Sequence, residues 1–237
     1  MRLVHVSAAA MVVALSVAGV SGQQPAPAQP PAGQAASQDA DRKVAGGGVL
    51  VKGWQGKADT GNRQGLTVND SKFAAEGAGF RITTGPAGIY WNPSNTAKGD
   101  YTVKATFKEA KQSYSHPHPF GVFIAGKALD SDAPNYLYCV AYRNGNFIVN
   151  QFVDGKVTQL VKRTPHDAVD KATGPDDDVT QEVGWTVKGG KAECTVNGQV
   201  VHSLDAAAAN VQSFDGIYGI RTSHNAEVVV TGLGLSK

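Results

Sequence analysis

The chain has 237 residues, a net charge of +2 and 18% charged residues, whose signs alternate along the sequence. There is no basic block of the kind that binds nucleic acid, so we expect no nucleic-acid partner. The 28 glycines and 11 prolines would be poorly tolerated in an all-helical fold and favour a fold with many turns.

The N-terminus has the features of a secretory signal peptide, predicted over residues 1–22. Arg2 supplies a positive start, residues 6–20 form an apolar run, and residues 20–22 offer small side chains for cleavage, with an alternative site after Ala18. The apolar run is shorter than the roughly 20 residues that a spanning helix needs. We therefore expect export to the periplasm or the exterior, with no membrane span after the signal is removed.

Two further regions follow the predicted signal peptide. Residues 23–45 consist mainly of Gln, Pro, Ala and Ser in low complexity. Such a segment cannot bury enough apolar surface to offset its ordering entropy, so it is predicted to be a disordered linker. Residues 46–237 remain for one folded domain, a length sufficient for a sizeable core.

Within this domain, apolar and polar residues alternate with period 2 and are interrupted by turn residues. The pattern predicts strands over residues 79–84, 87–91, 100–107, 120–125, 136–142, 146–153, 156–161, 179–187, 191–196, 199–202, 216–222 and 226–235. The dipeptides Asn144-Gly145 and Asn197-Gly198 are typical of tight hairpins, and only residues 205–210 look helical. The sequence therefore predicts an all-β fold, an antiparallel two-sheet β-sandwich or a barrel.

Two cysteines, Cys139 and Cys194, lie in predicted strands, each in the register of its apolar neighbours. Export permits a disulfide between them. Two separate buried thiols fit the pattern equally well, because a free cysteine behaves as a small buried apolar residue. Zinc is not expected at either cysteine, since the sequence has no CxxC motif and no histidine at ligand spacing from them.

Four phrases in this order, residues 118–126, 135–147, 193–201 and 216–225, resemble the concanavalin A-like lectin/glucanase superfamily, which consists of jelly-roll sandwiches and includes laminin-G-like domains. The resemblance runs from about Trp54 to Leu235 and is strongest to the bacterial 3-keto-disaccharide hydrolase family. It implies a jelly roll that binds or acts on glycans. The Glu-x-Asp-x-(x)-Glu strand of the superfamily's glucanases is missing here, so no local pair of carboxylates for glycoside cleavage is visible.

Histidines supply the first candidate site. His116 and His118 each precede a proline in the stretch from Tyr114 to Phe120, which holds them stiffly. They have the chemistry for metal binding or acid–base catalysis, whereas a rigid loop with histidines bonded to nearby backbone is the alternative. If the loops at one edge of the sandwich meet, His118, Arg143 and His224 share a pocket, and His118 and His224 are the candidate catalytic residues.

Tyrosines supply the second candidate feature. Tyr136, Tyr138 and Tyr142 share one face of a predicted strand, where their rings suit stacking against a sugar, although aromatic residues also build cores. The predicted ligand-binding set is therefore Tyr138, Arg143, His118 and His224.

No metal and no cofactor is expected at this set. Calcium is the alternative, held by the carboxylates of Asp130, Asp132 and residues 176–178.

These observations, together with the resemblance, predict an extracytoplasmic glycan-binding module whose partner is a carbohydrate. The first alternative is a glycoside hydrolase or lyase acting on a keto-disaccharide or related glycoside. Elimination from a keto sugar needs only a base, with or without the help of a metal, and His118 or His224 would serve as that base. The second alternative is a structural or protein-binding sandwich without a sugar site.

Overall fold

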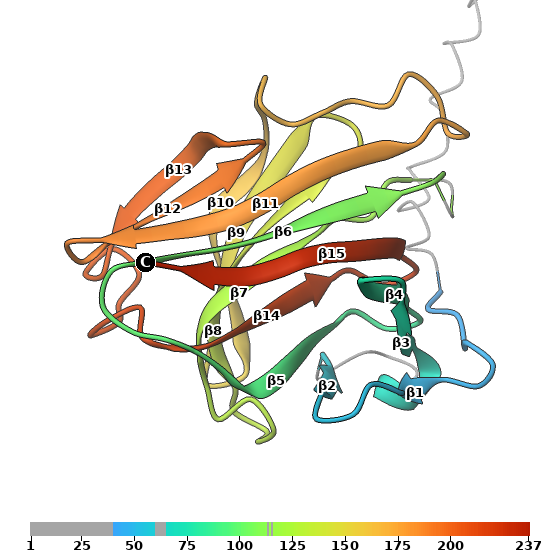
Figure 1. Ribbon diagram of the computed structural model, residues 1–237, viewed down its shortest axis with the longest axis horizontal. Coiled ribbons are helices and arrows are strands. Elements are labelled where there is room, and N and C mark those ends of the chain that lie inside the picture. The colour runs from blue at the N-terminus through green and yellow to red at the C-terminus, as the bar shows by residue number, and fades with distance from the viewer. Residues whose placement is uncertain (1–39, 60–64, 113, 115) are drawn as a thin grey trace, which may run out of the picture. The chain divides into compact units, whose positions relative to one another are not determined.

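A computed structural model describes residues 40–59, 65–112, 114 and 116–237 (Figure 1). The predicted signal peptide, and the predicted linker as far as residue 39, lie outside the described residues. The described chain forms fifteen strands in two sheets and one short 3-10 turn, η1 (Val68–Asp70). The predicted all-β antiparallel sandwich is therefore confirmed. Residues 206–210, which look helical in the sequence, form turns instead.

The first layer is a seven-stranded sheet in which every pairing is antiparallel. In spatial order its strands are β10 (Lys156–Pro165), β9 (Asn146–Val153), β8 (Asn135–Tyr142), β7 (Phe120–Lys127), β14 (Gly216–Thr222), β5 (Gly88–Ala97) and β2 (Gln55–Ala58). Because β7 and β14 are neighbours, the loop before β7 and the turn after β14 come out at the same end of the sheet.

The second layer is an eight-stranded sheet with one parallel pairing, between its first two strands. In spatial order its strands are β1 (Gly48–Val49), β3 (Lys72–Glu76), β4 (Gly79–Thr83), β15 (Glu227–Ser236), β6 (Tyr101–Glu109), β11 (Val179–Lys188), β12 (Lys191–Val196) and β13 (Gln199–Asp205). The C-terminal strand β15 thus lies in the middle of the sheet, between β4 and β6 (Figure 1).

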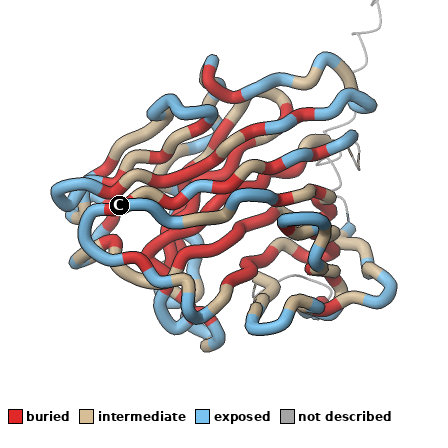
Figure 2. The backbone as a smooth tube through the Cα atoms, viewed as in Figure 1, coloured by how far each residue is buried: buried red, intermediate tan, exposed pale blue. Residues whose placement is uncertain are grey.

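The main core fills the space between the two sheets, where buried positions follow the strands of both layers (Figure 2). Alternation along β6 turns Val103, Ala105 and Phe107 into this core. A disulfide between Cys139 on β8 and Cys194 on β12, with Cα atoms 6.2 Å apart, joins the two layers. Of the two alternatives left open by the sequence, the structure shows the bonded one.

The seven-stranded sheet also buries apolar side chains on its outer face, the face turned away from the main core. Here alternation along β8 places Tyr136, Tyr138 and Val140. They form a second cluster with neighbours from β5, β7, β9 and the loop before β8, namely Ile89, Trp91, Phe123, Leu129 and Phe152. An antiparallel sheet usually presents its second face to water, so this cluster marks the outer face for closer description.

Residues 40–45, which fall at the end of the predicted linker, lie against the sandwich. Arg42 donates from Nε to the carbonyl of Thr84 at 2.8 Å and from Nη2 to that of Ala226 at 3.0 Å. The backbone amide of Val44 donates to the carbonyl of Asp70 at 3.0 Å. These bonds hold the beginning of the described chain beside the turn between β14 and β15. Within the part of the chain that the structure describes, no helix has the length and apolarity to cross a membrane.

Candidate functional site

A buried arginine occupies the outer face of the seven-stranded sheet. Arg221 on β14 is 7% exposed and binds the carboxylate of Asp59 with two prongs, Nη1 to Oδ1 at 2.5 Å and Nη2 to Oδ2 at 2.6 Å. Nη1 also donates to the hydroxyl of Tyr136 at 3.3 Å. Paired guanidinium and carboxylate groups of this geometry are among the strongest charge-assisted contacts in proteins.

Aromatic rings surround this ion pair. The guanidinium of Arg221 lies 4.9 Å from the ring centroid of Tyr138 and 5.6 Å from that of Phe152, distances at which cation–π attraction operates. The rings of Tyr136 and Phe152 stack at 4.6 Å. Asn150 donates from Nδ2 to the hydroxyl of Tyr138 at 3.0 Å, so the hydroxyls of Tyr136 and Tyr138 each have a polar neighbour.

The electrostatics of the cluster follow from this packing. Burial by itself would lower the pKa of Arg221, but the charge and the hydrogen bonds of the Asp59 carboxylate outweigh burial and hold the pKa well above the usual arginine value. Burial also raises the pKa of Tyr136 well above its ordinary range, against the opposing effect of Arg221. Arg221 is therefore a fixed cation, and Tyr136 is a neutral hydroxyl at physiological pH.

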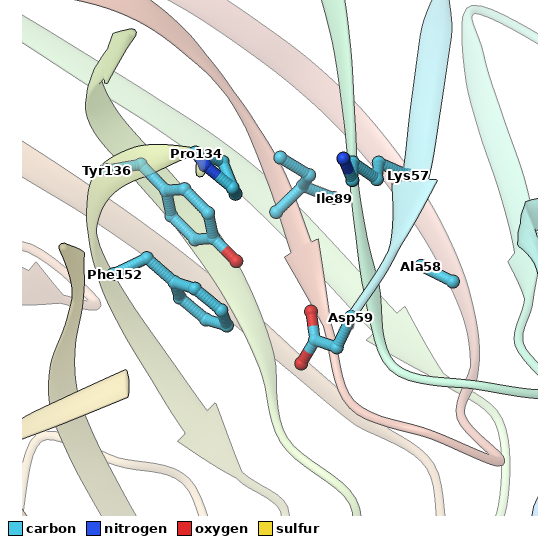
Figure 3. A pocket seen from close by; sticks show the side chains of 7 residues that line it. All are labelled: Lys57, Ala58, Asp59, Ile89, Pro134, Tyr136 and Phe152. Carbon is cyan, nitrogen blue, oxygen red and sulfur yellow. The ribbon is translucent and has the colours of Figure 1, made fainter. Parts of the chain in front are cut away.

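A small hollow borders the ion pair (Figure 3). It is lined by Lys57, Ala58, Asp59, Ile89, Pro134, Tyr136 and Phe152. Figure 3 shows the Tyr136 hydroxyl and the Asp59 carboxylate pointing into the same space. Its free volume of about 10 Å³ admits one water-sized group. A hydroxyl that enters the hollow meets a carboxylate acceptor, a phenol and the edge of an aromatic ring.

A second cluster lies at the end of the sandwich, where β7 begins and β14 has ended. The ring centroids of His116 and His118 are 4.5 Å apart, as are those of His118 and His224. One ring nitrogen from each of the three histidines lies within 4.8 Å of the others. His224 also donates from Nδ1 to Oδ1 of Asp41 at 2.8 Å. The structure thus brings together His118 and His224, as the sequence predicts, and adds His116 and Asp41.

Arg143, the third residue expected in that pocket, has other partners. It is 2% exposed, and its Nη1 lies 3.2 Å from Oε2 of the equally buried Glu109. Its Nη2 donates to the carbonyls of Gly174, Pro175 and Asp177. Burial raises the pKa of Glu109 to about 7, and Arg143 offsets this only in part. Arg143 thus ties the loop before β11 to the end of β6.

Tyr138, the fourth predicted residue, belongs to the Arg221 cluster and not to the histidine cluster. The predicted ligand-binding set is therefore divided among three places in the structure.

Two of the acidic residues considered for calcium contact different lysines. Asp178 pairs with Lys108 at 3.0 Å, and Asp132 lies 3.9 Å from Lys57. Among the described residues, the three histidines are the group whose ligand atoms converge for a metal ion.

Sequence reasoning missed Arg221, Asp59, Asn150, Phe152 and Asp41. Arg221 carried a usable signal, because it is the one charged residue in the predicted strand over residues 216–222. A charged side chain that becomes buried in a sheet needs a partner. Asp59 and Asp41 have no comparable signal, since each meets its partner across more than 160 positions of sequence.

Neither a protein-family model nor a curated protein matches the sequence. Among solved structures, the chain is similar to the carbohydrate-binding module CBM66 from Bacillus subtilis, with a TM-score of 0.54 and 12% identity over 80% of this chain and 99% of that one. It is also similar to a Bacillus subtilis protein of unknown function with a galectin-like fold, with a TM-score of 0.53 and 12% identity over 78% and 89% of the two chains. The chain is a jelly-roll sandwich.

This jelly roll is the fold that the resemblance to the concanavalin A-like superfamily implies, and that implication is confirmed. At these identities the likeness concerns the fold alone, because one sandwich hosts many functions. The narrower resemblance to 3-keto-disaccharide hydrolases has no support from a sequence match. The activity must therefore be argued from the side chains.

Proposed function

We propose that the domain binds a glycan at the outer face of its seven-stranded sheet, beside Arg221, Asp59 and Tyr136. The observation that carries this proposal is the two-pronged Arg221–Asp59 ion pair among aromatic rings. Removing an ion pair from water costs several kcal/mol per ion. The main core, on the other face of the sheet, contains neither Arg221 nor Asp59, so the fold does not need this pair for its main core. A costly polar group that borders a hollow points to a ligand.

The chemistry of this face suits a sugar. The Asp59 carboxylate accepts hydrogen bonds from hydroxyl groups, Tyr136 donates them, and the ring of Phe152 offers an apolar surface. Lys57 also lines the hollow, and its ammonium group, which donates to the carbonyls of Asp130 and Ser131, has a further hydrogen to donate. The size of the hollow suits a single hydroxyl, with the rest of the sugar lying outside it. Tyr138 remains part of the proposal, because its ring packs against the guanidinium of Arg221. Arg143 is not part of it, because its side chain holds the loop before β11.

Two further observations support the proposal. A solved structure of the same fold is a carbohydrate-binding module. The disulfide between Cys139 and Cys194 and the predicted signal peptide support a location outside the cytoplasm, where polymeric glycans are met.

A glycan array followed by calorimetry on the best ligand tests this site. Tyr136→Phe removes only the hydroxyl that points into the hollow, and Lys57→Ala removes a donor at its rim. We expect each to weaken binding by about tenfold, the equivalent of one lost hydrogen bond. The matched control is Lys191→Ala, on β12 in the other sheet. Equal affinities for all of these variants would refute the site.

The histidine cluster favours a second candidate function, cleavage of a keto-disaccharide or related glycoside. In this case His118 or His224 acts as the base, and the Asp41 carboxylate orients His224. The test compares the release of sugar from a 3-keto-disaccharide and from its unoxidised parent. His224→Ala should lower kcat far more than it changes KM, whereas absence of turnover by the unaltered protein would exclude this function for the substrates tested.

A further inference from the structure

We infer that His116, His118 and His224 form a binding site for one divalent transition-metal ion, of which zinc is the best suited. The site goes beyond glycan binding and differs from the Arg221 cluster in its chemistry, because it consists of imidazoles, whereas the sheet face holds aromatic rings and an ion pair. It is an alternative to the role of His118 or His224 as a base, because an imidazole nitrogen that binds a metal ion cannot accept a proton. The inference rests on how three histidines from two distant segments are made to converge.

Local sequence sets the first two ligands. His116 and His118 each precede a proline, which restricts both to extended backbone. In an extended chain, residues two positions apart point to the same side. The two rings accordingly lie together, with centroids 4.5 Å apart. The prolines limit the backbone conformations of both histidines, so the two ligands are preorganised for an ion.

The sheet topology brings in the third ligand. Phe120 at the start of β7 pairs with Thr222 at the end of β14, so the residues just outside these two positions meet at one end of the sheet. His224 therefore packs against His118, with ring centroids 4.5 Å apart and planes nearly perpendicular.

The spacing of the nitrogens fits a metal after a small adjustment. Zinc binds imidazole nitrogens at about 2.0–2.1 Å, which places tetrahedral ligand atoms roughly 3.3 Å apart. The three candidate nitrogens lie within 4.8 Å of one another, so the widest pair has to close by roughly 1.5 Å. Rotation of the partly exposed ring of His116 supplies such a movement, and the exposure of His116 and His224 also gives the ion a way in.

Asp41 supplies the outer contact that metal-binding histidines usually have. Its Oδ1 accepts from Nδ1 of His224 at 2.8 Å, which leaves Nε2 of that ring to face an ion. A carboxylate in this position fixes the ring and makes it more basic, and its loss typically costs tenfold to a hundredfold in metal affinity. Asp41 lies in the segment before the sandwich, so metal binding would also strengthen the docking of residues 40–45.

The ligand set determines which ion fits. Imidazole suits zinc, copper and nickel, whereas calcium and magnesium require oxygen ligands. Three protein ligands leave one tetrahedral position for water or a substrate oxygen, as in catalytic zinc sites. The site thus takes a transition metal, and calcium should not compete for it.

Titration of chelator-treated, tag-free protein with Zn²⁺ by calorimetry tests the inference, and Co²⁺ added to the same protein reports tetrahedral geometry by its visible absorption. We expect one ion per chain. His116→Ala and His224→Ala should each lower affinity about a hundredfold, and Asp41→Asn about tenfold or more. The matched control, His202→Ala on β13, should bind Zn²⁺ like the unaltered protein.

His118 is buried, so the partly exposed His116 carries the test, and circular dichroism checks that each variant is folded. Ca²⁺ in place of Zn²⁺ should give no heat of binding. The inference is overturned if the unaltered protein binds no stoichiometric Zn²⁺, or if the folded His116→Ala/His224→Ala variant binds it equally well. Glycan binding that persists in this double variant would show that the glycan site does not depend on the histidine cluster.

Discussion

Arg221 and Asp59 meet across β5, the strand that separates β14 from β2 in the seven-stranded sheet, with both nitrogen–oxygen distances at 2.6 Å or less. The arginine side chain is 8% exposed and the aspartate side chain 24%, so the cation is buried while the carboxylate is partly accessible to a ligand. This ion pair therefore holds the edge strand β2 in place and forms part of the proposed glycan site.

Asp59→Ala should lower the free energy of unfolding by about 3 kcal/mol, because it leaves the Arg221 cation buried without its counterion. Urea unfolding measures this loss. The double variant Asp59→Ala/Arg221→Met should recover part of it, since no unpaired charge remains. Glu227→Ala breaks an exposed pair with Arg81 and should cost under about 1 kcal/mol. A loss at Asp59 as small as that at Glu227 would contradict the role of the pair.

Much of the fold could be predicted because the alternation of apolar and polar residues is local. The strand expected over residues 100–107 is β6, and Asn144-Gly145 does connect β8 to β9. The short N-terminal strands β1, β2 and β3 were missed, since two to five residues carry too little alternation to recognise. Residues 205–210 were misjudged as helical because one turn of alanine does not repay the cost of helix nucleation without tertiary support.

The site was harder to predict, because it depends on which strands are neighbours. The His-Pro-His-Pro stretch shows two possible ligands, and the pairing of β7 with β14 brings His224 to them. Arg143 shows the opposite outcome. Its position before Asn144-Gly145 identifies a hairpin, but nothing in the sequence connects it to Glu109 on β6.

Reduction of the disulfide should destabilise the domain by about 4 kcal/mol or less. The bond between Cys139 and Cys194 closes a loop across 55 positions, which restricts the unfolded chain. Reduction keeps the volume of both side chains, so the core loses no packing. Unfolding in urea with and without a phosphine reductant measures the difference, with mass spectrometry to verify the thiols. Coincident curves for the oxidised and reduced forms would contradict this expectation.

Gly219 on β14 should tolerate no side chain. A Cβ at this position would lie 2.3 Å from the carbonyl oxygen of Tyr90 and 2.7 Å from the ring of Phe123. Gly219→Ala should therefore displace the pairing with β5 or the ring of Phe123, at a cost of about 1–3 kcal/mol. Gly189→Ala is a useful comparison, because its Cβ would meet no atom within 4 Å and its strain comes from the backbone alone. Thermal unfolding of a Gly219→Ala protein that matched the unaltered one would disprove the steric argument.

The carboxyl group of Glu109 should make stability depend on pH in a direction opposite to that of most carboxylates. Burial raises its folded-state pKa from 4.5 to about 7, against the opposing pull of Arg143. Between these values the folded protein holds a proton that the unfolded chain releases, so the free energy of unfolding falls as pH rises.

The contribution of Glu109 is therefore fully present below the unfolded-state value of 4.5 and is lost as pH rises through about 7. In total it amounts to at most roughly 3–4 kcal/mol. Urea unfolding of the unaltered protein and of Glu109→Gln across this window isolates it, because glutamine does not titrate and other groups act equally in both. The stability of the unaltered protein relative to the variant should decline toward neutral pH. Glu193→Gln on β12 controls for the substitution itself. A difference between the unaltered protein and Glu109→Gln that stays constant, or grows with pH, would show that Glu109 is ionised throughout, with the Arg143 cation outweighing the effect of burial.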